Sequence, residues 1–314
     1  MSTSSPTLAA CRRLFEQHGY PILLEAFPEV AELTAAAHVG GGSDILGADD
    51  MLSREGVWGA TFELFLRDEE YRDVGQSVRE VMNTSLPEEF EGYPTASGKG
   101  PSIDVFSVKG YLRERLGISH FPTSQMEWLG ISEHALCMFT GGEIFYDPIG
   151  ELTQAQKRYA SYYPSDVWKL YIARAAYACW FYGEHNFPKR IAPRRDPVTA
   201  ALAIGTFVRA AMQLVFLLHR EYAPYWKWMH WRFMQLGGVA KEVDPLLNGM
   251  TATADLEETA KLVGEACLVL REAIVQKELV PDGAKMECMG AFDIMRTLSG
   301  AELARQPLRV PVEF

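Results

Sequence analysis

HVGGGSDILGADDMLSRE, residues 38–55, is the stretch that decides the fold, and the alternating apolar segment TFELFL, residues 61–66, follows it. Small and apolar residues run into three glycines, a serine and several carboxylates. Glycine reaches positive φ at low cost, so the N–H groups of such a turn can face a phosphate. Carboxylates next to a phosphate would repel it unless a divalent cation lay between them. The stretch therefore predicts a site for a metal-bound nucleoside triphosphate.

Strands and helices are expected to alternate around this glycine turn. Strands are expected at residues 34–39, 61–66 and 102–108, a helix at 67–83, a surface loop at 86–101 and a hairpin at 137–146. Before the turn, helices are expected at 8–18, where Gly19 and Pro21 give a stop signal, and at 22–32. Periodic helical segments follow at 153–160, 164–182, 196–222, 224–236, 255–278 and 285–299. We therefore expect an α+β chain, with an α/β domain built on a small mixed sheet (residues 1–150) and an all-helical bundle (residues 151–314).

Composition limits the classes of function. The chain has 314 residues and a formal net charge of −11, which opposes binding to nucleic acid or to an anionic membrane. Its five cysteines are scattered and the N-terminus resembles no signal peptide, so a cytoplasmic location is expected. The apolar segment 200–218 is long enough to span a membrane, but Arg209 lies near its middle. A buried helix of a soluble bundle is the favoured interpretation.

The spacing of the glycine turn and its acids approximates a nucleotidyltransferase signature. Gly41, Gly42 and Ser43 are followed by Glu55, and Asp104 lies on a predicted strand, where a third carboxylate is expected. Nucleotidyl transfer uses Mg²⁺ ions held by carboxylates to neutralise the triphosphate and activate the attacking oxygen. A glycine turn with solvated acids explains the same residues, and the spacing alone leaves both interpretations open.

Several separated motifs resemble an uncharacterised family of nucleotidyltransferase-like proteins, a domain of unknown function. The resemblance covers roughly residues 20–300 and rests on GSDILGADDMLSR (42–54), LFL (64–66), LPEEFEGY (86–93), YYPSDVW (162–168), NFPKR (186–190) and YAPYWKW (222–228). It implies a nucleotidyltransferase α/β domain followed by a helical bundle, as in enzymes that adenylylate aminoglycosides.

The resemblance also implies roles for individual residues. Phosphate would be held by the backbone of Gly41 and Gly42 and by Ser43. The candidate metal ligands are Asp49, Asp50, Glu55 and Asp104, and the candidate catalytic residues among them are Glu55, Asp104 and Asp50. Mg²⁺ or Mn²⁺ would be the cofactor and ATP the substrate.

One departure bears on catalysis. Where the family continues with Asp-His-Asp-Trp-Gly-Pro, this chain has Glu55-Gly56-Val57-Trp58-Gly59-Ala60. Glutamate can still ligate a metal, whereas valine cannot. Either Asp49, Asp50 or Glu63 replaces the missing ligand, or the protein is a catalytically impaired binder of nucleotides or metabolites.

The helical half supplies the remaining candidates. Lys227 lies outside the aromatic stripe of residues 222–233 and is assigned to a phosphate contact. Asn186, Arg190 and Trp226 are assigned to the acceptor. Core packing is the favoured explanation for most of the aromatic residues, and helix-end charge is the favoured explanation for the basic segment 185–195.

Other site types are disfavoured by the sequence. Residues 44–55 do not fit a calcium-binding EF-hand, because Leu46 and Ala48 occupy ligand positions. Residues 97–100 do not fit a P-loop, and the seven histidines include no pair at zinc-site spacing. The hypotheses are therefore a nucleotidyltransferase acting on a small hydroxylated acceptor, a decayed binding protein on the same scaffold, or an interaction protein of the antitoxin kind. Homodimer formation through the apolar helices is left open.

Overall fold

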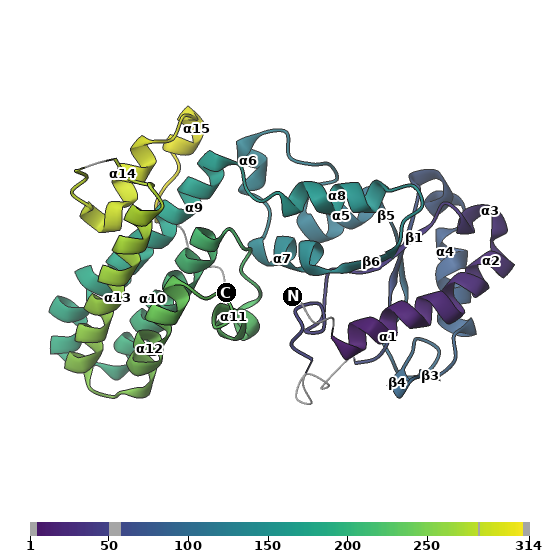
Figure 1. Cartoon of the computed structure of the whole chain (residues 1–314), viewed down its shortest axis with the longest axis horizontal. Helices are drawn as coiled ribbons and strands as arrows, with labels where there is room; N and C mark the ends of the chain where they lie inside the picture. Colours follow the sequence, from purple (N-terminus) through teal and green to yellow (C-terminus); the bar gives the residue numbers. More distant parts are fainter. Residues whose placement is uncertain (1–4, 50–57, 282, 310–314) are drawn as a thin grey trace. The chain divides into compact units, whose positions relative to one another are not determined.

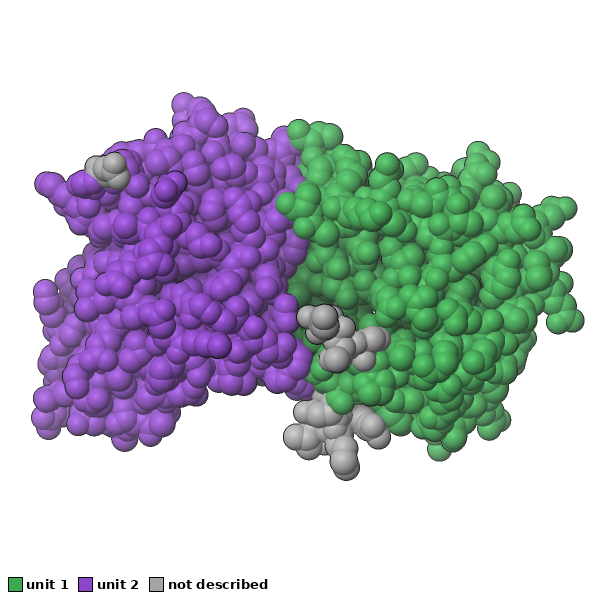
Figure 2. All heavy atoms as spheres, viewed as in Figure 1, with its two compact units in different colours: residues 1–123, 130–161 green, residues 124–129, 162–314 purple. Residues whose placement is uncertain are grey.

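The computed structural model describes residues 5–49, 58–281 and 283–309. The chain divides into two compact units, which Figure 2 colours separately. Unit 1 comprises residues 1–123 and 130–161, and unit 2 comprises residues 124–129 and 162–314. Unit 1 is built on a sheet and unit 2 is helical, which confirms the α+β class.

A four-stranded mixed sheet forms the centre of unit 1 (Figure 1). Its strand order is β5-β2-β1-β6, with β1 antiparallel to both β2 and β6 and β2 parallel to β5. The bounds are β1 Ala35–His38, β2 Glu63–Leu66, β5 Asp104–Ser107 and β6 Glu143–Tyr146. The three strands expected at residues 34–39, 61–66 and 102–108 are thus present, each shorter than its sequence pattern.

Helices complete unit 1. They are α1 Pro6–Leu14, α2 Tyr20–Ala26, α3 Pro28–Ala31, α4 Asp68–Ser85, α5 Val108–Leu116, α7 Glu133–Gly141 and α8 Glu151–Ala160, with the π-helical turn η1 Phe15–Gly19. Ala36 of β1, Leu64 of β2 and Val105 of β5 belong to one buried cluster with residues of α1, η1, α2 and α4. Phe65 and Phe106, which alternate with those residues along their strands, instead contact Tyr111 of α5. Both faces of the sheet are therefore covered.

The helix expected to stop at Gly19 does not stop there. Gly19 has helical dihedrals, and the chain continues through η1 into α2. Tyr20 N–H donates to Phe15 O, a wider turn that admits Pro21 without the clash it would make in a regular α-helix. A Cβ at position 19 would lie 2.7 Å from Phe62 Cζ. The glycine therefore permits close packing on the strand side.

Two further local predictions were wrong. The expected loop at 86–101 contains a short hairpin, β3 Glu89–Phe90 paired with β4 Tyr93–Pro94. The expected hairpin at 137–146 is instead the end of α7 followed by β6, which pairs with β1. Gly142 separates the two elements, and a Cβ there would lie 2.5 Å from Val39 Cγ1. The Gly-Gly pair thus marks a helix-to-strand junction packed on β1.

Unit 2 consists of helices. They are α6 Gln125–Trp128, α9 Ser165–Ala178, α10 Pro197–His219, α11 Trp226–Phe233, α12 Val239–Ala252, α13 Leu256–Gln276, α14 Ala291–Arg296 and α15 Ala301–Ala304, with the short turns η3 Cys179–His185, η4 Phe187–Ile191, η5 Ala192–Arg194 and η6 Glu287–Gly290. Asp196 and Asp255 accept backbone N–H bonds at the first turns of α10 and α13, as capping residues do. The sequence analysis missed α12, whose periodic pattern is interrupted by Pro245. Helix α8, which follows residue 150, belongs to unit 1.

Helix α10 is long and apolar enough to cross a membrane. More than half of its most apolar window, 56%, is buried inside the protein. Phe207, Leu214 and Phe216 are completely buried. This is typical of the core helix of a soluble protein.

Candidate functional site

The glycine turn leaves the sheet at the end of β1. Gly40 and Gly42 have φ values of +85° and +115°, which disfavour any residue with a side chain. Beyond them the chain makes successive turns, in which Leu46 N–H and Ala48 N–H both donate to Ser43 O. Gly41 is exposed and has open space around its Cα. The turn therefore presents backbone to the surface of unit 1. In the nucleotidyltransferase signature, Gly-Ser lies at the start of a helix. Gly42 and Ser43 begin no regular helix here.

Tyr111 supports the turn from below. Its ring lies among Phe65, Phe106 and Phe139, and a Cβ on Gly40 would lie 2.4 Å from its hydroxyl oxygen. The hydroxyl is buried and has no hydrogen-bond partner among the described residues. Burial raises the pKa of Tyr111 far above its usual range, so the phenol stays neutral.

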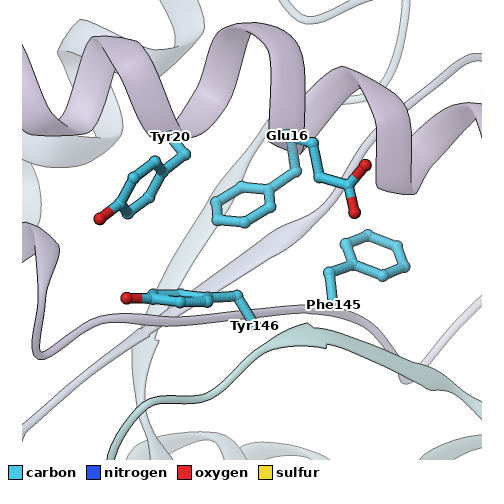
Figure 3. Close-up of a pocket in the computed structure, with 5 residues that line it drawn as sticks. Glu16, Tyr20, Phe145 and Tyr146 are labelled. Atoms are coloured by element: carbon cyan, nitrogen blue, oxygen red, sulfur yellow. The ribbon is translucent and has the colours of Figure 1, made fainter.

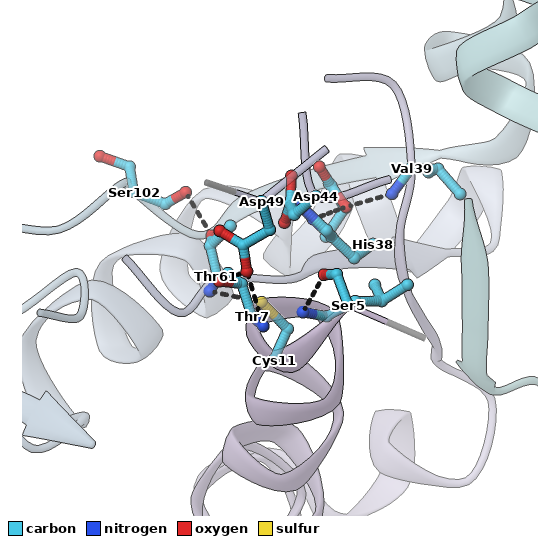
Figure 4. Close-up of polar contacts among 11 residues, drawn as sticks. Ser5, Thr7, Cys11, His38, Val39, Asp44, Asp49, Thr61 and Ser102 are labelled. Carbon is cyan, nitrogen blue, oxygen red and sulfur yellow. Dashed lines mark hydrogen bonds and ion pairs between the residues drawn. The ribbon is translucent and has the colours of Figure 1, made fainter. Parts of the chain in front are cut away.

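His38, the last residue of β1, lies between the carboxylates of Asp44 and Glu63, and Figure 4 shows its contact with Asp44. Its Nε2 is 2.8 Å from Asp44 Oδ2 and its Nδ1 is 3.6 Å from Glu63 Oε2. The same Glu63 oxygen accepts the N–H of Val39 at 3.0 Å. The side chains of His38, Asp44 and Glu63 are 6%, 13% and 15% exposed. Strand β1, strand β2 and the turn thus place three ionisable groups together in a nearly dry environment.

Opposing effects act on the pKa of His38. Burial alone lowers the pKa of an imidazole, but the hydrogen bond and charge of Asp44, together with the nearby carboxylate of Glu63, raise it by more. The net pKa lies well above the usual value of a histidine. The raised pKa favours the protonated form of the ring beside the two carboxylates.

Cys11 of α1 completes the group. Its sulfur accepts the N–H of Thr61 at 3.3 Å, and the side chain is fully buried. Burial raises the pKa of the Cys11 thiol to about 11. The sulfur, a ring nitrogen of His38 and a carboxylate oxygen of Asp44 all lie within 4.8 Å of one another.

Glu63 and Asp104 lie side by side on adjacent strands. They are Cα partners in the parallel pairing of β2 with β5, and each is the first residue of its strand. Asp104 is 40% exposed and accepts a hydrogen bond from Arg79 of α4 at 2.9 Å. Among the acids predicted from the sequence, Asp104 therefore lies beside Glu63. Glu63 in turn contacts His38 at the end of β1, directly before the glycine turn.

Asp49 has a structural partner instead. Its Oδ2 accepts hydrogen bonds from the backbone N–H and the hydroxyl of Thr7, in the first turn of α1. A carboxylate at this position interacts favourably with the dipole of α1 and accepts the hydrogen bond of an N–H group that has no partner within the helix. The structure thus gives Asp49 a helix-capping role, and Asp50 and Glu55 lie outside the described residues.

The candidate residues from the helical half all belong to unit 2. Arg190 donates to Asn186 Oδ1 at 3.0 Å, and Asn186 donates to Phe181 O at 2.7 Å, so these two side chains stabilise their own helical turns. Trp226 is 60% exposed at the start of α11. Lys227 Nζ lies 5.2 Å from the ring centre of Trp228, close enough for a cation–π contact.

A separate pocket opens between η1 and β6 (Figure 3). Its volume is about 190 Å³ and its lining residues are Phe15, Glu16, Tyr20, Phe145 and Tyr146. This is smaller than the roughly 300–1,000 Å³ of ordinary ligand sites. A single carboxylate among aromatic rings also gives the wrong charge for a phosphate.

Sequence reasoning did not single out Cys11, His38 or Asp44 as site residues. The spacing of the histidines gave no zinc pair, because neither partner of His38 is a histidine. Cys11 comes from α1, far away in the sequence, and Asp44 comes from the turn. One signal was available. His38 ends an otherwise small and apolar strand directly before the glycines, where a polar ring must find partners inside the fold.

Comparisons with known proteins add one finding. A family model described as Domain of unknown function (DUF4037) matches residues 128–229, about a third of the chain. The match runs from the end of unit 1 into the first helices of unit 2. A search of the curated proteins and a search of the solved structures each gave no match.

Proposed function

We propose that this chain is a cytoplasmic nucleotidyltransferase-like enzyme that transfers a nucleoside monophosphate, from ATP by preference, to a hydroxyl group of a small acceptor. The observation that carries the proposal is the pairing of Glu63 and Asp104 at the start of parallel strands, with Glu63 touching the strand that leads into the glycine turn. A phosphate cradle and a pair of carboxylates at one edge of a sheet are what such a reaction needs.

The donor set fits Mg²⁺ or Mn²⁺. Both contacts of Glu63 described above use Oε2, which leaves Oε1 for a metal, and Asp104 is partly exposed. Carboxylate oxygens are the ligands that Mg²⁺ prefers. The ion would neutralise the triphosphate, and Asp50 and Glu55 remain candidates for completing its ligand set.

The chain's own residues would divide the remaining work. The N–H groups around Gly41 and Gly42 and the Ser43 hydroxyl would hold phosphate oxygens. The acceptor oxygen would form a bond to the α-phosphorus while the bond to pyrophosphate breaks, and a carboxylate would take the hydroxyl proton. The assignments of Lys227 to phosphate and of Asn186, Arg190 and Trp226 to the acceptor stay predictions from the sequence; all four residues belong to unit 2.

A second candidate, a nucleotide-binding protein without turnover, is favoured by two observations. The carboxylate of Asp49 accepts a hydrogen bond from Thr7 and that of Asp104 accepts one from Arg79, so both already have partners within the protein. Replacement of the family's second paired acid by Val57 removes another ligand. Restoring Asp-His-Asp at residues 55–57 separates the two candidates, because only a decayed enzyme gains turnover from it.

Pyrophosphate release tests the catalytic proposal. The protein would be incubated with each nucleoside triphosphate, Mg²⁺ or Mn²⁺ and a panel of hydroxylated acceptors including aminoglycosides. We expect release with the wild type and a loss of at least 100-fold in Asp104→Asn, with Asp73→Asn, an acid on α4 outside this edge, as the matched control. Absence of release with every metal and acceptor, while ATP still binds, would favour the second candidate.

A further inference from the structure

The buried group formed by Cys11, His38 and Asp44 combines three kinds of metal-binding atom. A thiol from α1, an imidazole from the end of β1 and a carboxylate from the glycine turn converge within 4.8 Å (Figure 4). Thiolate, imidazole and carboxylate together are the ligands of zinc-class sites, whereas Mg²⁺ and Ca²⁺ take oxygen ligands. The donor chemistry therefore differs from that of the Glu63–Asp104 edge.

Surrounding atoms hold each donor in place. Thr61 N–H points at the Cys11 sulfur, a contact that also suits a thiolate. Asp44 follows Gly42, where a Cβ would lie 2.1 Å from Asp44 Oδ1. The glycine at that position thus keeps space for the carboxylate.

His38 provides an independent observation. Its ring is 6% exposed, yet Nδ1 makes no hydrogen bond with the described residues, and Glu63 Oε2 lies 3.6 Å away. A buried polar atom without a hydrogen bond is rare in a folded protein. Metal-bound histidines commonly direct the nitrogen that does not bind the metal at a carboxylate, which fixes the ring orientation. With Nε2 on a metal, Glu63 would have that position.

We propose that Cys11, His38 and Asp44 bind a divalent transition-metal ion of the zinc class, with Glu63 as the positioning residue for His38. Typical zinc ligand distances are about 2.0–2.3 Å, which places ligand atoms roughly 3.3–3.7 Å apart. The His38–Asp44 distance of 2.8 Å has to widen slightly, and a separation at the upper limit of 4.8 Å has to shorten by about 1 Å. Water completes the coordination.

Binding of the ion would displace the proton of the Cys11 thiol, and His38 would bind through an unprotonated ring nitrogen. None of the three ligands is assigned to phosphate or Mg²⁺; only Glu63, which positions His38 here, is also assigned to the nucleotide site.

Cobalt spectroscopy tests the site. Untagged, metal-free protein would be titrated with Co²⁺ in the absence of nucleotide, and a near-ultraviolet thiolate-to-cobalt band would report the sulfur ligand. We expect one Co²⁺ per chain, displaced by Zn²⁺ and not by excess Mg²⁺. Cys11→Ser should abolish the band, His38→Gln should weaken binding at least tenfold, and Cys288→Ser, which changes a partly buried thiol of unit 2, should leave both unchanged.

Circular dichroism of each variant establishes that it folds. If Cys11→Ser fails to fold, Asp44→Asn takes its place, with at least tenfold weaker binding expected and the sulfur band retained. A wild type without the band, or a band that survives in Cys11→Ser, would overturn the proposal and leave a buried ion pair only.

Discussion

Two aspartates that are largely shielded from solvent, one in each unit, show how differently the chain uses such a charge. Asp166 at the start of α9 in unit 2 accepts hydrogen bonds from Ser299 N–H, the Ser299 hydroxyl and Gly300 N–H. Asp44 in unit 1 faces the His38 ring and lies near the Cys11 thiol. The partners of Asp166 are neutral donors that do not titrate near neutral pH. Those of Asp44 can exchange a proton or a metal, which is typical of a functional site.

His38→Leu should have the largest effect on stability. It leaves Asp44 and Glu63 buried without their cation, and breaking a buried pair in this way costs about 4 kcal/mol. Urea titration of the metal-free protein measures the loss. His230→Leu is the matched control, because His230 and Asp244 are also 2.8 Å apart but His230 is 42% exposed. We expect that control to cost less than about 1 kcal/mol, and equal losses would remove the contrast with exposed pairs.

Asp166→Ala should come next, at about 3 kcal/mol, because it leaves the N–H groups of Ser299 and Gly300 without their acceptor. Hydrogen exchange at Ser299 and Gly300 should accelerate in the same variant. The effect should be confined to unit 2, so cobalt binding by the variant should match the wild type. Loss of cobalt binding would show that Asp166 and the His38 group are not independent.

Gly40→Ala should cost about 2 kcal/mol. The residue has φ of +85°, and its new Cβ would lie 2.4 Å from the Tyr111 hydroxyl oxygen. Gly41→Ala is the control, since a Cβ there meets no atom within 4 Å, and should cost less than about 0.5 kcal/mol. Thermal melting compares the two. Equal melting temperatures would mean that the turn is not constrained by Tyr111.

The pH dependence of Asp166 should give the smallest effect. Burial raises the pKa of this carboxyl, but the hydrogen bonds from Ser299 and Gly300 outweigh burial and lower it overall. Its contribution to stability is therefore present above the unfolded pKa of about 3.9 and is lost as pH falls through the lower folded pKa. The difference in stability between wild type and Asp166→Asn should shrink below pH 4. A difference that grows on acidification would contradict the assigned direction.

Local pattern was sufficient to predict much of the fold. Alternating apolar residues located β2 and β5, a run of small residues located β1, and helical periodicity located α4, α9, α10 and α13. It failed where tertiary packing overrides a local signal. Gly19 predicts a helix stop, but its missing side chain allows the ring of Phe62 to approach the helix. Gly142 predicts a hairpin turn, but it packs against Val39.

The candidate site could be predicted only in part. Position 104 was correctly placed on a strand, and the structure adds that it is the first residue of that strand and that Glu63 is its Cα partner. The capping role of Asp49 was not foreseeable, because Thr7 lies 42 residues away in the sequence. For the same reason the convergence of Cys11 with His38 has no local sequence pattern.

The measurement that tests the central claim most directly is calorimetric titration with a non-hydrolysable ATP analogue, with and without Mg²⁺. We predict one nucleotide per chain, bound only when Mg²⁺ is present, and at least tenfold weaker binding by the Glu63→Gln/Asp104→Asn double variant. Metal-independent binding, or equal affinity in the double variant, would contradict the assignment of this sheet edge to a metal-bound nucleotide.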